Sequence, residues 1–231
     1  MKKLYQALQH FTELLYPKLC GACGLHLLEN ETVLCVYCRA LLPFSNESHD
    51  PDNATEKLFW GNVPVEAAAT LLFFNKSART QVLLHQLKYH QRFEIGEMLG
   101  ELFAQALVHS GRFDAVNMII PVPLHPERAK FRGYNQSAVI ANSMASILKV
   151  PVANKLLLRK INTESQTKKN RIERFDNMEC VFSVASPDEV KGQNILIIDD
   201  VITTGATLIS SAQALHQAGS NELFIGAIAK A

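Results

Sequence analysis

Apolar residues occur along this 231-residue chain in short, nearly unbroken runs that alternate with stretches of helical periodicity. Four of these runs have the length and composition of strands buried on both faces. They lie at 63–74, 118–122, 195–198 and 223–229. Helical periodicity is found at 78–87, 93–108, 140–148 and 208–215. Two shorter runs, 156–158 and 181–184, predict additional strands. The alternation predicts an α/β fold in which helices flank a parallel sheet.

The beginning of the chain has a different pattern and predicts a separate small unit. The segment up to Pro17 has the apolar spacing of a short amphipathic helix. Residues 43–57 are rich in proline, serine, asparagine and aspartate, which is typical of a linker or exposed loop. We therefore place a domain boundary near Trp60, with an N-terminal unit at 1–60 and a larger domain at 61–231.

The N-terminal unit contains two Cys-x₂-Cys pairs separated by eleven residues, formed by Cys20, Cys23, Cys35 and Cys38. This spacing is typical of a tetrahedral zinc site with four thiolate ligands. The alternatives are two disulfides or four free thiols, and a cytoplasmic location disfavours disulfides. Because cysteine fills all four positions, we expect the Zn²⁺ to be structural rather than catalytic.

The run at 195–198 leads into the most informative stretch of the chain. Asp199 and Asp200 follow it directly, and a short loop then leads into a helical pattern. Strand, loop and helix together suit a phosphate group, because the helix start offers free N–H groups and a partial positive charge. The residues of this loop are Thr203, Thr204, Gly205, Ala206 and Thr207.

The two carboxylates would repel that phosphate and instead suit a sugar diol or a hydrated Mg²⁺. A ligand with a phosphate, a diol and a metal-bound diphosphate would use every part of the stretch. Phosphoribosyl pyrophosphate (PRPP) is such a ligand, and the stretch resembles the PRPP-binding motif of type I phosphoribosyltransferases. The alternative is an ordinary buried strand followed by a capped helix.

A second strand-loop-helix pattern begins at the run 118–122 and carries a basic loop. Candidate ligand-binding residues in this loop are Arg128, Lys130, Arg132, Gly133 and Tyr134. In a parallel sheet both loops open on the same edge, so two anion sites would hold the two ends of PRPP. The alternative is a proline-rich connection with solvated charges.

The order Pro-Val-Pro-Leu-His-Pro, then Arg-Gly-Tyr-Asn-Gln, at 121–136 resembles the ComF family. Its members are bacterial phosphoribosyltransferase-like proteins linked to competence for DNA uptake, with an N-terminal Cys₄ zinc module. The resemblance covers nearly the whole chain and is most specific at the four cysteines, at 121–136 and at 195–207.

Charge is unevenly distributed, although the net charge is only +1. Residues 76–175 hold 16 Lys/Arg against 7 Asp/Glu, whereas both flanking parts are acidic. A basic middle suits a polyanion, either a diphosphate or a nucleic acid.

The resemblance implies a mobile loop near 161–177 that closes over PRPP, and its candidate cations are Arg159, Lys160, Lys168 and Arg171. The alternative is a plain surface loop. The cluster at 88–92 fits either the mouth of the site or an interhelical loop.

The resemblance implies ribosyl transfer from PRPP with Mg²⁺, in which Asp199 and Asp200 are the catalytic candidates. The acceptor cannot be identified, so enzymatic activity remains open. A second hypothesis is a non-catalytic protein that handles single-stranded DNA during transformation and retains the PRPP site. A third is a scaffold that contacts competence-machinery proteins.

We find no apolar run long enough for membrane insertion and no targeting signal, so a cytoplasmic location is expected.

Overall fold

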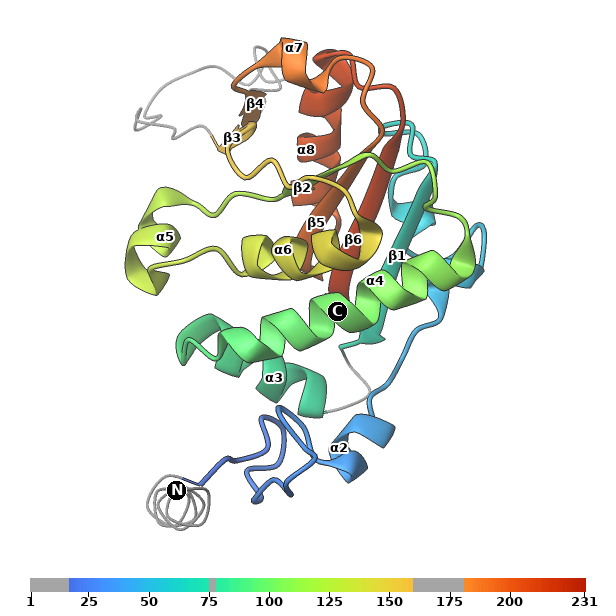
Figure 1. Cartoon of the computed structure of the whole chain (residues 1–231). Helices are drawn as coiled ribbons and strands as arrows, with labels where there is room; N and C mark the ends of the chain where they lie inside the picture. The colour runs from blue at the N-terminus through green and yellow to red at the C-terminus, as the bar shows by residue number, and fades with distance from the viewer. Residues whose placement is uncertain (1–16, 75–77, 160–180) are drawn as a thin grey trace.

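The computed structural model describes residues 17–74, 78–159 and 181–231, and its centre is a four-stranded parallel sheet (Figure 1). The strand order is β1 (Ala67–Phe73), β6 (Leu223–Lys230), β5 (Ile195–Ile202) and β2 (Met118–Pro121). Pro121 pairs with Ile198, so the chain that follows β2 begins beside Asp199, and the loop after β5 opens four residues further along, on the same edge of the sheet. The predicted parallel α/β architecture is confirmed.

Helices cover both faces of this sheet, as the apolar composition of its strands requires. On one face, Leu196 and Ile198 pack with the longest helix, α4 (Phe93–Ser110), and with α6 (Gln136–Leu148) and α3 (Ala78–Tyr89). On the other face, Ile195 and Ile197 pack with α8 (Ala206–Gln217). Successive β5 residues thus alternate between two cores, because side chains of a strand point to opposite faces in turn.

Close contact between α4 and α6 fixes the position of the basic loop that precedes α6. A Cβ atom at Gly100 would lie 2.0 Å from the Ser143 hydroxyl and 2.7 Å from the Ile140 carbonyl oxygen. Only glycine allows the two helix backbones to approach this closely. The middle of α6 therefore lies directly against α4.

The remaining elements are short. The predicted loop after β2 contains a helix, α5 (Pro126–Arg132), which projects from the body of the molecule (Figure 1). The runs near 156 and 181 form β3 (Leu157–Arg159) and β4 (Phe182–Val184), an antiparallel pair outside the main sheet. A short helix, α7 (Pro187–Val190), follows β4, and α2 (Val36–Ala40) lies in the N-terminal unit.

The polar segment at 43–57 is not a linker or exposed loop, so this interpretation was wrong. It contains two 3₁₀ helices, η1 (Glu47–His49) and η2 (Glu56–Leu58), and packs along the free edge of β1. The buried carboxylate of Glu47 accepts hydrogen bonds from the Thr70 backbone N–H (3.0 Å) and from the Thr70 and Thr55 hydroxyls (both 2.7 Å). Covering an edge strand in this way prevents it from pairing with another chain.

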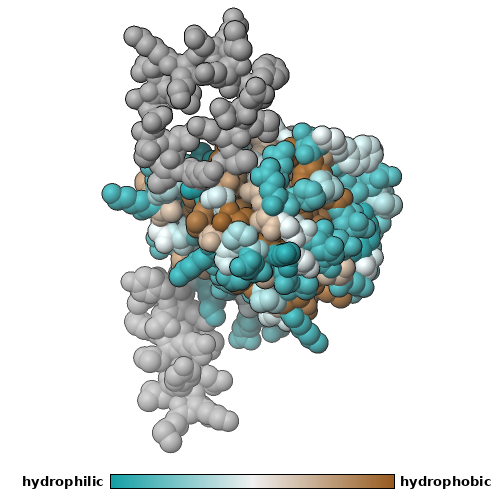
Figure 2. Space-filling view, turned by 90° about the horizontal axis from the view of Figure 1, so that it is seen from above, coloured by the Kyte–Doolittle hydropathy of each residue, from teal (hydrophilic) through white to brown (hydrophobic). Residues whose placement is uncertain are grey.

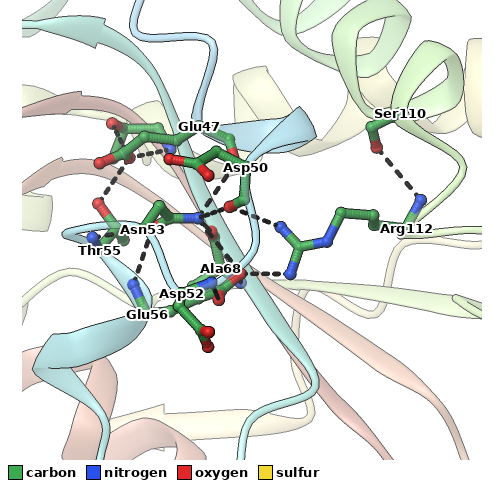
Figure 3. Close-up of polar contacts among 10 residues, drawn as sticks. Glu47, Asp50, Asp52, Asn53, Thr55, Glu56, Ala68, Ser110 and Arg112 are labelled. Atoms are coloured by element: carbon green, nitrogen blue, oxygen red, sulfur yellow. Dashed lines mark hydrogen bonds and ion pairs between the residues drawn. The ribbon is translucent and has the colours of Figure 1, made fainter.

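The buried carboxylate of Glu56 makes further contacts between this segment and the sheet domain (Figure 3). Glu56 accepts from the backbone N–H of Ala68 (3.2 Å) and from the Arg112 guanidinium (2.6 Å). Asn53 donates to the carbonyl oxygen of Ala68 at 2.8 Å. Residues 47–56 thus belong to the folded body that includes β1, and the domain boundary near residue 60 stays a prediction.

In the described parts of the chain, every helix is too short or too polar to cross a membrane. The face shown in Figure 2 is mostly hydrophilic, with hydrophobic side chains gathered in a few small areas.

Candidate functional site

Three parts of the chain converge on the acidic pair that follows the buried half of β5. The Ser137 hydroxyl, in the first turn of α6, donates to Asp199 Oδ1 at 3.1 Å. The Asp200 backbone N–H donates to the same oxygen at 2.8 Å. The Lys88 ammonium, near the end of α3, lies 3.0 Å from Asp200 Oδ2. The acidic pair is thus held from its own strand, from the start of α6 and from α3.

Asp199 lies beside a second carboxylate. Burial, and after it the neighbouring Asp200 carboxylate, raise the pKa of Asp199, the hydrogen bonds from the Asp200 N–H and the Ser137 hydroxyl oppose this rise, and the resulting pKa is about 7. A site of this kind can donate or accept a hydrogen bond, which suits a sugar diol.

The hydroxyl-containing loop lies immediately beyond the acidic pair and leads into α8. Gly205 precedes α8 with a φ of 79°, a left-handed conformation that glycine adopts without strain. Thr203 and Thr204 are exposed, and the Thr204 hydroxyl accepts from the Ala206 backbone N–H at 3.4 Å. Residues 199 and 201–208 line a small pocket of about 30 Å³. The free N–H groups of α8 and these hydroxyls form an arrangement that can bind a phosphate.

The basic loop divides into a part that contacts the site and a part that does not. Arg132 donates to Gln136 Oε1 at 2.8 Å, and its guanidinium carbon lies 5.3 Å from the centre of the Tyr89 ring. By contrast, α5 has no buried residue, and Arg128 and Lys130 are exposed on it. Of the three predicted cations in the loop, Arg132 is the one whose described contacts lie beside the acidic pair.

Three further positions shape this loop. Gly133 ends α5 with a φ of 76°. Asn135 then starts α6: its side chain accepts from the Ser137 N–H at 3.1 Å and donates to the Val122 carbonyl oxygen at 3.0 Å. Tyr134 packs edge-on against Phe93 with 4.6 Å between ring centres, and its buried hydroxyl has no hydrogen-bond partner among the described residues. These contacts turn the chain from the exposed α5 back to the acidic pair.

The remaining predicted cations are distributed differently. Arg159 lies in β3, and its guanidinium carbon is 5.5 Å from the Phe182 ring centre. Lys160, Lys168 and Arg171 lie outside the described residues.

Lys88 and Ser137 contact the acidic pair but were absent from the predicted site residues. The pattern at 88–92 left a place at the mouth of the site open, and the structure places Lys88 there. Ser137 follows the Asn135 cap directly, and nothing in its sequence position indicated the contact with Asp199.

The four cysteines of the N-terminal unit converge in space. Their Sγ atoms all lie within 4.8 Å of one another, and those of Cys23 and Cys35 are 3.8 Å apart. Four thiolates at about 2.3 Å from a tetrahedral Zn²⁺ would be about 3.8 Å from one another. The Cys35 and Cys38 backbone N–H groups also donate to the Cys20 and Cys35 sulfur atoms, both at 3.4 Å. None of these four cysteines is in a disulfide, and their arrangement fits a zinc ion.

The cysteine cluster packs on the start of α3 and on α4. The Arg79 side chain is hydrogen-bonded to Cys38, and its guanidinium carbon lies 5.5 Å from the Tyr37 ring centre. A Cβ atom at Gly21 would lie 3.1 Å from Ile95. The residues that position the cysteines thus share a hydrophobic core with the sheet domain.

Comparisons with known proteins agree with this geometry. Residues 135–230 match the family model of the phosphoribosyl transferase domain. The chain is 30% identical to competence protein F of Haemophilus influenzae over 154 residues, 65% of this chain and 67% of that protein. It is 31% identical to DNA utilization protein YhgH of Escherichia coli K12 over 141 residues, 60% of this chain and 61% of that protein.

Over 102 residues the chain is 38% identical to competence protein ComFC of Bacillus subtilis, covering 44% of this chain and 39% of that protein. These alignments span between 39% and 67% of the relatives' own length. A solved glutamine PRPP amidotransferase of B. subtilis is 19% identical, with a TM-score of 0.42, over 57% of this chain and 25% of that one. By its sequence relatives and its phosphoribosyl transferase domain, the chain belongs to the ComF family.

Proposed function

We propose that this protein binds PRPP together with Mg²⁺ and acts as a phosphoribosyltransferase in a process linked to DNA uptake. The observation that supports this most is the contact between Ser137 and Asp199, because it joins the helix that follows the basic loop to the acidic pair of β5. In this proposal the loop 203–207 supplies a phosphate site on one side of the acidic pair, and Arg132 supplies a cation on the other. The acidic pair itself binds the diol. The names of the competence and DNA-utilization relatives support the link to DNA uptake.

In this proposal each part of PRPP has its own binding group. The loop 203–207 and the start of α8 hold the 5′-phosphate, and Asp199 and Asp200 hold the ribose hydroxyls. Arg132 faces the diphosphate, and Arg128, Lys130, Gly133 and Tyr134 complete the basic loop. The predicted cations Arg159, Lys160, Lys168 and Arg171 would also help to neutralise the diphosphate. Bound Mg²⁺ would supply charge neutralisation for the departing diphosphate.

The chemistry of transfer follows from these positions. The bond between ribose C1 and the diphosphate oxygen breaks, a bond from C1 to the acceptor forms, and the acceptor loses a proton. Positive charge develops on the sugar as the diphosphate leaves, and the carboxylates of Asp199 and Asp200 stabilise it. The acceptor is the open part of this proposal.

Calorimetric titration with PRPP and Mg²⁺ tests binding. Replacing both Asp199 and Asp200 by alanine should abolish the binding heat, whereas Asp188→Asn, an exposed acidic residue on α7, should not change it. Equal affinity of the double variant and the unmodified protein would refute the assignment. A screen of acceptors that measures diphosphate release then tests catalysis.

We propose that Cys20, Cys23, Cys35 and Cys38 bind one structural Zn²⁺. The fit of the sulfur atoms to a tetrahedral site supports this. Elemental analysis of the purified protein should give about one zinc per chain, and Cys38→Ser should lower this ratio. A protein that is stable and free of metal would contradict the proposal.

A second candidate function is the binding of single-stranded DNA by α5. The Phe131 side chain is 81% exposed, and it is flanked by Lys130 and Arg132. An exposed aromatic ring among cations can stack on a base while the cations contact phosphates. Binding should weaken as salt is raised, and Phe131→Ala should reduce it, whereas Val108→Ala on α4 should not. Lack of binding at low salt would remove this candidate.

Two broader proposals remain. We place the protein in the cytoplasm as a soluble partner of competence-machinery proteins, without membrane insertion. We also keep the division into a module at 1–60 and a phosphoribosyltransferase-like domain at 61–231. Cell fractionation and a pull-down with a variant that lacks residues 1–42, which keeps the segment bonded to β1, test these points. Unchanged partner capture by that variant would argue against a scaffold role for the module.

A further inference from the structure

The last two residues of α3 contact different loops of the candidate site. Lys88 Nζ lies 3.0 Å from Asp200 Oδ2, and the Tyr89 ring centre lies 5.3 Å from the guanidinium carbon of Arg132. The first contact is to the acidic pair within β5, and the second is to the basic loop after β2. The end of α3 therefore forms a third side of the site.

The ion pair of Lys88 with Asp200 is largely withdrawn from water, since the two side chains are only 20% and 13% exposed. Such a pair is screened less than a surface pair, and removing the cation would leave a partly buried carboxylate unpaired. Asp199 is the immediate neighbour of Asp200 and repels it. The Lys88 ammonium, bound to Asp200, offsets the repulsion between these two neighbouring carboxylates.

We propose that Lys88 is a positioning residue of the ligand site: its ammonium group holds the Asp200 carboxylate in the orientation that receives the ribose hydroxyls. This inference rests on the proposed binding of PRPP. Lys88 acts through Asp200, so the lysine should matter only while the Asp200 carboxylate is present.

A double-mutant cycle tests this dependence, because two residues that act through one interaction give non-additive effects. Affinities for PRPP and for ribose 5-phosphate, both with Mg²⁺, are measured by calorimetry on the full chain. The proteins are the unmodified chain, Lys88→Met, Asp200→Asn and the double variant. Ribose 5-phosphate lacks the diphosphate, so it reports on the sugar and 5′-phosphate contacts alone.

We expect Lys88→Met to weaken both ligands by about tenfold and the double variant to bind no more weakly than Asp200→Asn alone. Lys88→Arg should recover part of the loss, because it retains the positive charge. Lys155→Met, at an exposed position before β3, should bind like the unmodified chain. Thermal melts identify any variant that is unfolded, and Lys88→Gln replaces Lys88→Met in that case.

Additive losses in the double variant would overturn the proposal, since Lys88 would then act independently of Asp200. An unchanged affinity of Lys88→Met would overturn it as well. A loss for PRPP without a loss for ribose 5-phosphate would also contradict it, because Lys88 would then serve the diphosphate. If the unmodified chain binds neither ligand, the proposed function fails first and this inference fails with it.

Discussion

Arg79 and Lys88 lie nine positions apart on α3, and each contacts a different candidate binding site. Arg79 is hydrogen-bonded to Cys38 of the cysteine cluster, and Lys88 is paired with Asp200 of the acidic pair. At a rise of about 1.5 Å per residue these two points are about 13 Å apart along one rigid element. A change at the cysteine cluster can therefore reach the acidic pair through α3.

Removal of zinc should lower both the melting temperature and the affinity for PRPP. Without the metal, the segment around Cys38 loses the bonds that fold it, and α3 loses its support at Arg79. The measurement is calorimetry on protein treated with a zinc-selective chelator, dialysed and supplied again with Mg²⁺. Adding zinc back to this protein should restore both the melting temperature and the affinity for PRPP. An unchanged PRPP affinity in the zinc-free protein would show that α3 keeps its position unaided.

The stability of the ligand-free protein should fall as the pH rises from about 4 to about 7, because of Asp199. Burial raises the pKa of Asp199 from 3.8 to about 7 in the folded protein. Over this interval the unfolded chain has lost a proton that the folded protein keeps, so the free energy of unfolding decreases with pH. The expected decrease is on the order of 2–4 kcal/mol.

Urea unfolding of the unmodified protein and of Asp199→Asn across this pH range isolates the contribution of Asp199 to stability. The difference in the free energy of unfolding between these two proteins should grow as the pH rises, since the asparagine amide cannot ionise. Asp188→Asn, an exposed control on α7, should leave the pH dependence unchanged. Parallel curves for Asp199→Asn and the unmodified protein would show that Asp199 titrates normally.

Gly205→Ala should weaken binding of a 5′-phosphate, whereas Gly192→Ala should not. Both glycines have positive φ values, 79° and 74°, so each alanine should cost about 1–2 kcal/mol of stability. Only Gly205 lies in the loop that precedes α8, where a shifted backbone would move the phosphate-binding N–H groups. Ribose 5-phosphate affinity and urea unfolding are measured on both variants. If Gly205→Ala and Gly192→Ala lost the same affinity for ribose 5-phosphate, the loss would come from reduced stability and not from the loop before α8.

Periodicity and composition were sufficient to predict the parts of the fold that depend on local pattern. The strand at 195–198 was predictable because its residues are apolar without interruption and face two cores in alternation. The meeting of two loops on one sheet edge followed from the parallel arrangement of β2 and β5. The confirmed family also agrees with the motifs at these loops.

Contacts between distant parts of the chain were not predictable in the same way. Lys88 pairs with a carboxylate 112 positions later, and a lysine in a polar cluster has many possible partners. Glu47 belongs to a segment with the composition of a loop, yet it is buried because Thr70 on β1 satisfies its oxygens. Pro126 suggested a connection, but proline at the first helical position instead starts α5.

Arg112→Met should destabilise the protein without changing the ligand site. Arg112 donates to the buried carboxylate of Glu56 at 2.6 Å and to the Asp50 carbonyl oxygen at 3.0 Å (Figure 3). Its loss leaves a buried charge partly unpaired, for which we expect a cost of about 2–4 kcal/mol. Urea unfolding measures this cost. The double variant with Glu56→Gln should be less destabilised than the sum of the single variants, because the unpaired charge is then absent. PRPP affinity at low temperature should equal that of the unmodified protein, and a loss there would show that the contacts along β1 also support the acidic pair.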